Sequence, residues 1–202
     1  MNWLDPKKTA LIIVDIQFDF CAPEGISAQY GAEVSHIGKM LPYLEGFHRE
    51  VKKKQIPCFF TRFINKKTGA PKNLKHLHSL KKLFPICVEG TKGAEIYELT
   101  PSPKDIIIDK QYYDGFAGTS LLRELKKNKI ETLLLAGVWT DMCVDATAKR
   151  AFSEGFNVII LKDLVSTIDE RMNRHKAALE DFDKYYGFVR SSTEIIELLQ
   201  NS

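Results

Sequence analysis

The chain has 202 residues, of which 44% are hydrophobic and 27% charged, and its formal net charge is +3. This length and composition fit one globular domain over residues 1–202, with enough apolar side chains for a full core. A small net charge with scattered lysines is not typical of nucleic-acid-binding proteins, and no apolar run approaches the length of a membrane span. We therefore expect the chain to bind neither nucleic acid nor a membrane.

The first half of the chain alternates between strand-like and helix-like segments. Thr9–Val14 is a continuous apolar run, typical of a strand that is buried on both faces. Apolar residues between positions 37 and 51 recur at helical spacing, and residues 56–61 form the next predicted strand. Residues 65–103 are polar and rich in turn residues, so they predict a long loop of the kind that forms lids or binding loops.

The second half repeats this alternation. The predicted strands are residues 105–109, 131–136, 158–161 and 187–189. The predicted helices follow Thr119, begin at Cys143, open at Asp169 and follow Thr193. The pattern favours an α/β fold with a doubly wound, mostly parallel sheet of five or six strands and helices on both faces, as in Rossmann-like proteins. No phosphate-binding glycine motif is present, and we expect no cofactor.

The four cysteines and the N-terminus indicate the compartment. The cysteines show no Cys-x-x-Cys pair and no spacing typical of zinc sites or secreted disulfide scaffolds. They are Cys21, Cys58, Cys87 and Cys143. The first residues of the chain lack a basic region followed by an apolar core. The sequence thus predicts a cytoplasmic protein with reduced thiols.

Three reactive side chains follow three of the predicted strands. Asp15 ends the first strand, Lys110 follows the third, and Cys143 follows the fourth. The carboxyl ends of parallel strands meet at one edge of the sheet, so an acid, a base and a nucleophile are expected there together. A thiol at a helix N-terminus faces unpaired N–H groups and the positive end of the helix dipole, which favour the thiolate.

Each of these residues alone has an ordinary interpretation. A carboxylate at a strand end most often caps a turn, a lysine there is usually solvated, and a cysteine in a first helical turn is often a small buried hydrophobe. The coincidence of three complementary groups favours a catalytic site.

Three motifs in this order resemble those of the isochorismatase-like cysteine hydrolases, the family related to N-carbamoylsarcosine amidases and nicotinamidases. They are VDIQFDF at residues 14–20, Lys110 followed by FAGT at residues 116–119, and GVWTDMCV at residues 137–144. The resemblance covers nearly the whole chain. It implies a catalytic triad of Asp15, Lys110 and Cys143, and a cis peptide between Val138 and Trp139. It also implies an oxyanion hole formed by the N–H groups of Trp139 and Cys143.

The resemblance further implies hydrolysis of a C–N bond in a small non-peptide amide, such as a carbamoyl, ureido or carboxamide compound, through a thioester. It implies a homodimer or homotetramer. Isochorismatases cleave a vinyl ether instead and carry a non-nucleophilic residue where this chain has Cys143. Amide hydrolysis is therefore favoured, with vinyl-ether hydrolysis and a catalytically silent binding protein as alternatives. A phosphoacceptor receiver domain is disfavoured because Val14 precedes Asp15 and the second strand ends in Thr61 and Arg62.

Nicotinamidases of this family bind a metal through an Asp-Trp-His segment after the second strand. Here Phe63 and Asn65 replace two of those ligands. His76 and His78 are an isolated pair, for which ordinary loop histidines are the favoured interpretation. We therefore expect no metal.

Substrate contacts are predicted from weaker signals. Aromatic residues near the catalytic strand ends either line a substrate pocket or pack in the core. They are Phe20, Tyr112, Tyr113, Phe116 and Trp139. Arg62 either holds a substrate carboxylate or forms a surface ion pair. Asp19 and Asp163 either orient the loops around the site or cap turns.

Overall fold

The computed structural model describes residues 4–200. Residues 1–3, part of the N-terminal segment used above to predict the compartment, lie outside the described residues, as do residues 201–202. Within residues 4–200, no helix has the length and apolar composition needed to cross a membrane.

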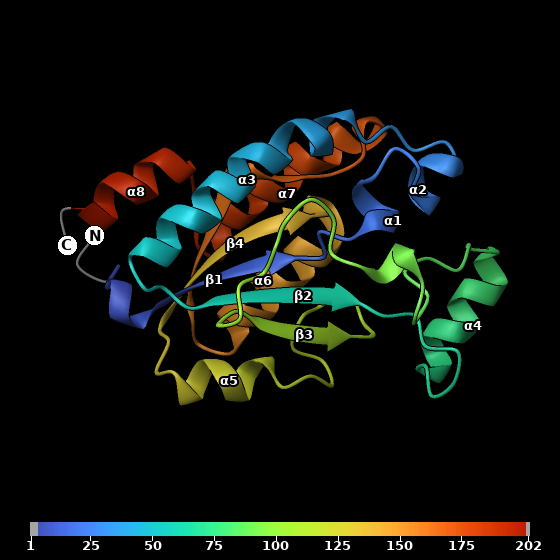
Figure 1. The fold of residues 1–202 in the computed structure, drawn as a ribbon, viewed down its shortest axis with the longest axis horizontal. Coiled ribbons are helices and arrows are strands. Elements are labelled where there is room, and N and C mark those ends of the chain that lie inside the picture. Colours follow the sequence, from blue (N-terminus) through green and yellow to red (C-terminus); the bar gives the residue numbers. More distant parts are fainter. Residues whose placement is uncertain (1–3, 201–202) are drawn as a thin grey trace.

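A six-stranded parallel sheet forms the centre of the molecule (Figure 1). Its strands are β1 (Thr9–Val14), β2 (Cys58–Phe63), β3 (Ile106–Lys110), β4 (Thr132–Val138), β5 (Asn157–Ser166) and β6 (Phe188–Arg190). Their order across the sheet is β3-β2-β1-β4-β5-β6, which is the order of a doubly wound nucleotide-binding-type fold. The predicted α/β fold class is confirmed.

Helices cover both faces of this sheet. The α-helices of the described chain are α1 (Phe18–Cys21), α2 (Ile26–Gln29), α3 (Ser35–Lys53), α4 (Lys72–Lys81), α5 (Leu121–Lys127), α6 (Asp145–Ser153), α7 (Met172–Tyr185) and α8 (Ser192–Gln200). Apolar residues of α3 and α8 pack on one face, and those of α5, α6 and α7 pack on the other. In Figure 1, α3 and α8 lie above the sheet and α5 lies below it.

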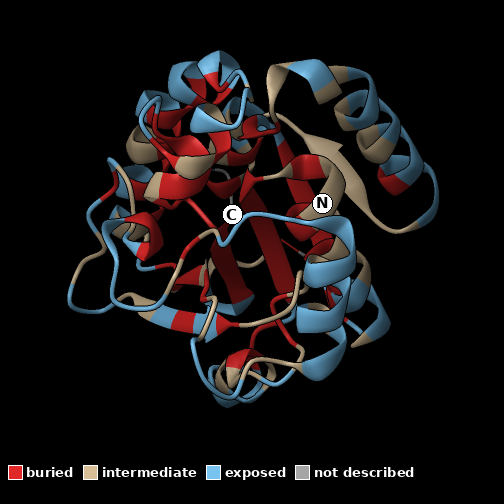
Figure 2. Cartoon of the chain, turned by 90° about the vertical axis from the view of Figure 1, so that its right-hand side faces the viewer, coloured by how far each residue is buried: buried red, intermediate tan, exposed pale blue. Residues whose placement is uncertain are grey.

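Strand β1 shows why the sheet needs helices on both of its faces. All six of its residues are buried, and the buried residues concentrate in the central strands (Figure 2). Leu11 and Ile13 join the core under α3, whereas Ile12 and Val14 join the core under α5 and α6. Because successive side chains point to opposite faces, an unbroken apolar run requires helices on both.

Most strand boundaries differ from the predicted ones, by one to five residues. The second strand begins at Cys58 rather than at residue 56, because Pro57 has no N–H for the ladder; its carbonyl accepts the N–H of Leu11 at 2.9 Å. Strand β5 extends to Ser166 and therefore contains Asp163, which was placed after it.

The long segment after β2 contains a helix that was predicted as loop. Helix α4 has no buried residue, so its sequence lacks a fully apolar face. Figure 1 shows α4, α1 and α2 on the side to which the strands β1, β2 and β3 point. In this fold, ligands bind at the carboxyl ends of the strands.

Candidate active site

The three strand ends bring Asp15, Lys110 and Cys143 into contact. Lys110 Nζ lies 2.7 Å from Asp15 Oδ2 and 3.5 Å from Cys143 Sγ. The three residues are 0%, 1% and 6% exposed, so they form a buried cluster at the edge of the sheet.

Asp15 is fixed by its neighbour on the adjacent strand. Its backbone has a φ of 51°, which turns the chain sharply at the end of β1. Thr61 Oγ1 donates to Asp15 Oδ1 at 2.7 Å, and the N–H of Asp15 donates to the carbonyl of Thr61 at 3.1 Å. The β1–β2 register, which pairs Val14 with Thr61, creates this contact. Sequence reasoning missed Thr61 because register is not visible in the sequence.

Lys110 is held as a cation by its surroundings. Its Nζ donates to the carbonyls of Tyr112 and Tyr113, each at 3.0 Å. Burial acts to lower the pKa of this amine, but Asp15 and Cys143 outweigh burial, and the net pKa is raised. The Lys110 ammonium therefore faces both the carboxylate and the sulfur.

Cys143 lies in a π-helical turn, Thr140–Val144, and helix α6 proper begins at Asp145. Helical structure thus starts three residues before the predicted position. Burial raises the pKa of the Cys143 thiol to about 12, and Lys110 only partly opposes this effect. Burial therefore acts against the thiolate that is expected at a helix N-terminus.

The peptide between Val138 and Trp139 is cis. It follows Gly137, whose φ of 111° and close approach to Val14 leave no room for a side chain. The carbonyl of Trp139 accepts the N–H groups of Met142 and Val144, which fixes the turn that carries the cysteine.

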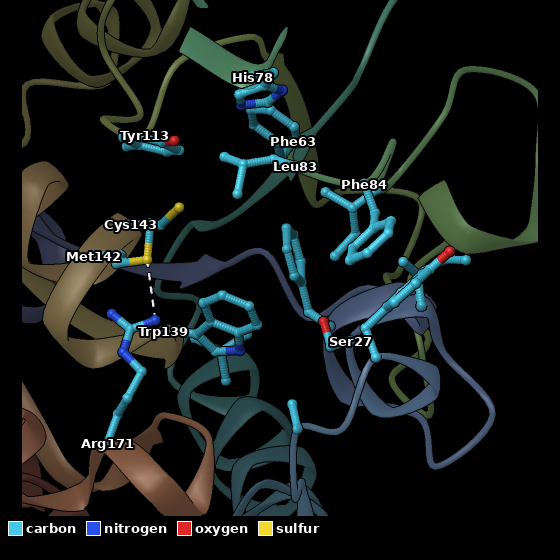
Figure 3. Close-up of a pocket in the computed structure, with 16 residues that line it drawn as sticks. Ser27, Phe63, His78, Leu83, Phe84, Tyr113, Trp139, Met142, Cys143 and Arg171 are labelled. Atoms are coloured by element: carbon cyan, nitrogen blue, oxygen red, sulfur yellow. Dashed lines mark hydrogen bonds between the residues drawn. The ribbon is translucent and has the colours of Figure 1, made fainter. Parts of the chain in front are cut away.

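A cavity of about 340 Å³ opens above Cys143 (Figure 3). Six of its lining residues are aromatic: Phe20, Tyr30, Phe63, Phe84, Tyr113 and Trp139. The cavity therefore offers a mainly apolar surface to a ligand whose reacting atom meets the sulfur.

Comparison with known proteins identifies the family. The isochorismatase domain matches residues 9–194. The chain belongs to the isochorismatase family. Ureidoacrylate amidohydrolase RutB of Methylobacterium radiotolerans is 27% identical over 200 residues, which cover 92% of this chain and 77% of that protein. Maleamate amidohydrolase of Pseudomonas putida is 32% identical over 115 residues, which cover 56% of this chain and 53% of that protein.

A solved cysteine hydrolase from Pseudomonas syringae pv. phaseolicola 1448A has a TM-score of 0.87 at 20% sequence identity. The match covers 98% of this chain and 95% of that one. At this identity, the likeness concerns the fold alone. The isochorismatase-family chain therefore shares both the sequence pattern and the architecture of its relatives.

Three of the predicted substrate residues line the cavity, namely Phe20, Tyr113 and Trp139. Phe20 and Trp139 pack edge to face with ring centroids 5.2 Å apart. These rings form part of the wall beside the sulfur.

The other three lie elsewhere. Arg62 pairs with Asp109 through two hydrogen bonds, of 2.7 and 2.9 Å, on the outer side of β2, because its side chain points away from those of Thr61 and Phe63. Phe116 packs in the core under α5 and α6. Tyr112 contributes its carbonyl to Lys110, and its hydroxyl donates to Asn73.

Arg171 lines the cavity and was not predicted. Its guanidinium contacts the Asp141 carboxylate and donates to Met142 Sδ at 3.2 Å (Figure 3). It belongs to a short 3-10 turn, Asp169–Arg171, before α7. No sequence signal marks it, because its position depends on how the chain returns after β5.

Two polar side chains, those of Gln17 and Asp19, form hydrogen bonds that position the loops around the cavity. Gln17 is buried, and its amide exchanges hydrogen bonds with the N–H and carbonyl of Phe63. Asp19 accepts the N–H of Cys87 at 2.7 Å and that of Ile26 at 3.3 Å. Asp19 thus orients loops, whereas Asp163 caps α8 by accepting the N–H of Ser192.

The segment after β2 does not fit the metal site of nicotinamidases. Phe63 is a cavity wall, and the N–H of Asn65 donates to the carbonyl of Cys87. His76 and His78 lie on α4, where residues two apart do not face each other. His78 alone lines the cavity.

Within residues 4–200, one group of side chains has metal-ligand spacing: His48, Cys58 and Asp105. Its carboxylate already contacts the Lys52 ammonium and the His48 imidazole. These contacts satisfy the cluster without a metal. The four cysteines are free and buried.

Proposed function

We propose that this chain is a cysteine amidohydrolase that cleaves a C–N bond of a small non-peptide amide through a thioester on Cys143. One observation carries the proposal: the Lys110 ammonium contacts both Asp15 and Cys143 at the base of an apolar cavity. The amidohydrolase activities named for the relatives support the same reaction class.

The first half-reaction begins with a neutral thiol. As the amide carbon approaches, Asp15 accepts the thiol proton and Cys143 Sγ attacks the carbon, so that no free thiolate accumulates beforehand. Lys110 stabilises the negative charge while it passes from sulfur to oxygen. We assign the oxyanion to the N–H groups of Trp139 and Cys143, a type of contact worth about 3 to 4 kcal/mol per donor.

Collapse of this intermediate breaks the C–N bond. Asp15 returns its proton to the departing amine or ammonia, and a thioester remains on Cys143. Asp15 next takes a proton from water, which attacks the thioester carbon, and the thiol leaves protonated. One amide and one water thus yield one acid, or carbamate, and one amine.

Ammonia release across a panel of primary amides, N-carbamoyl amino acids and ureido acids tests the proposal. We expect release to fall about 10⁴-fold or more in Cys143→Ala, because the nucleophile is lost. Cys58→Ala is the matched control, since this thiol is equally buried and lies outside the cavity lining. Full activity in Cys143→Ala would contradict the mechanism. If no compound is cleaved, vinyl ethers are the next substrates to test.

A further inference from the structure

The cavity suggests which amides fit this chain. We infer, on the basis of the proposed function, that the preferred substrate is an uncharged amide carrying a bulky apolar group, and that Tyr30 and Phe84 limit its length. Polar carboxylates such as maleamate and ureidoacrylate are then poor substrates.

The guanidinium and the ammonium at the cavity are already paired with carboxylates. Arg171 is the lining guanidinium, but the Asp141 carboxylate already neutralises it. Thr167 Oγ1 donates to the other oxygen of Asp141 at 2.8 Å. Moving Arg171 onto a substrate carboxylate would leave Asp141, whose side chain is 6% exposed, as a buried uncompensated charge. The Lys110 ammonium is likewise paired, with Asp15.

The remaining basic side chain in the lining, that of His78, belongs to α4. In Figure 3 it lies on the opposite wall from Arg171. Ser27 Oγ, Trp139 Nε1 and Arg171 Nε in the lining have no hydrogen-bond partner and can make single polar contacts. Among the lining residues described here, however, no guanidinium or ammonium is free of a carboxylate partner and able to neutralise a substrate carboxylate.

The size and the lining of the cavity suit a ligand with a bulky apolar group. A volume of about 340 Å³ lies within the range of pockets that hold drug-sized ligands. Beyond the sulfur, the walls are rings and aliphatic side chains such as Phe63, Leu83 and Ile86. Hydrophobic transfer therefore provides most of the affinity for the part of the substrate that does not react.

Two stacked rings form the wall of the cavity that lies farthest from the sulfur. Tyr30 follows α2 and Phe84 follows α4, and their rings stack with an interplanar angle of 13°. In Figure 3, Phe84 lies across the cavity from Cys143. Tyr30 is 56% and Phe84 46% exposed, so this pair separates the cavity from solvent. An acyl chain whose carbonyl lies at Cys143 extends toward this pair.

The test compares straight-chain primary amides of increasing length, each matched with an amide that bears a terminal carboxylate in place of the methyl group. We expect kcat/KM of the neutral series to rise about fourfold per methylene until the chain meets the Tyr30–Phe84 pair. The carboxylate partners should be slower by about 10-fold or more. Equal rates within the matched pairs, or no rise with length, would overturn the inference while leaving amide hydrolysis established.

Two variants locate the length limit. Phe84→Ala should shift the optimum to longer chains, because it opens the far wall. Leu80→Ala is the matched control: this leucine, on the same helix-bearing segment, is 68% exposed and does not line the cavity. An unchanged optimum in Phe84→Ala would show that Phe84 does not limit the length of the substrate.

Calorimetric binding to Cys143→Ala separates the inference from the proposed function. Dissociation constants of the neutral amides should fall with length, with a negative heat-capacity change from apolar burial. If no amide is hydrolysed but binding tightens in this way, the proposed reaction fails and the inference stands. Binding that is independent of length, or stronger for the carboxylates, contradicts the inference whatever the activity.

Discussion

At the scale of single residues, burial determines how the cysteine is used. The sequence places Cys143 near helix N–H groups and a lysine, both of which favour the thiolate. The structure buries the sulfur, and this desolvation raises the pKa of the thiol. In the proposed mechanism, Cys143 is therefore protected until a substrate arrives, and Asp15 is the group that removes its proton.

Alkylation of Cys143 tests this protected state. With iodoacetamide, the rate at this site should be low at pH 7 and rise about tenfold per pH unit up to pH 9, without a plateau, because the pKa of the thiol is raised to about 12. Site-resolved mass spectrometry measures the rate. A plateau near pH 7 would mean that Lys110 and the helical turn overcome burial.

The Asp15–Lys110 pair makes a second prediction at this scale. Both side chains are at most 1% exposed, so Lys110→Met leaves a buried carboxylate without its partner. We expect a loss of about 3–5 kcal/mol in the free energy of unfolding, measured by urea denaturation. Asp15→Asn combined with Lys110→Met should recover much of this loss and remain inactive. No recovery in the double variant would show that packing, not charge, sets the cost.

The sequence predicts that Asp15, Lys110 and Cys143 lie together, because parallel strands end at one edge. It does not predict Thr61 or Arg171, because the first depends on strand register and the second on the path of a loop. Nor does it predict the direction of the thiol pKa shift, since the sequence does not show how completely a strand end is covered.

At the scale of elements, strands were easier to predict than the segment between β2 and β3. Strand β1 matches its predicted bounds because six successive buried positions leave a plain apolar run. Helix α4 was missed because its residues are half-buried or exposed, so its leucines at positions 74, 77 and 80 stand among lysines and histidines. Part of the cavity wall, including Phe84, comes from this region, which explains why that ring was not identified from the sequence.

Asp19→Ala tests whether the Asp19 carboxylate positions the segments that border the cavity. The change leaves the buried N–H of Cys87 without its acceptor and frees that of Ile26. We expect a loss of about 1–3 kcal/mol in unfolding free energy and a rise in KM larger than the fall in kcat, because both segments border the cavity. Asp163→Ala is the control, since it uncaps α8 instead. Equal effects of the two changes on KM would contradict the assigned role.

At the scale of the whole molecule, the four buried thiols couple folding to alkaline pH. Burial raises the pKa of each; Cys58 rises from 9.0 to about 12. Above pH 9 the unfolded chain therefore binds fewer protons than the folded chain, and stability falls as pH rises.

Comparison of the native chain with Cys58→Ala isolates one of these contributions. Between pH 9 and 12, the unfolding free energy of the native chain should fall by about 1 kcal/mol per pH unit more than that of the variant. Parallel pH profiles of the two proteins in urea denaturation would show that this thiol titrates alike in both states.

The sheet edge holds Asp15, Lys110 and Cys143, whereas outlying segments hold Tyr30 and Phe84. This separation has a consequence for how such proteins diverge. On the proposed function, we expect mutations and insertions in α2, α4 and the residues that follow them to alter which compound is accepted without moving Asp15, Lys110 or Cys143. These segments are therefore the natural place for a combinatorial library, and for exchange of cassettes between relatives. New specificities are accessible there at little risk to the chemistry.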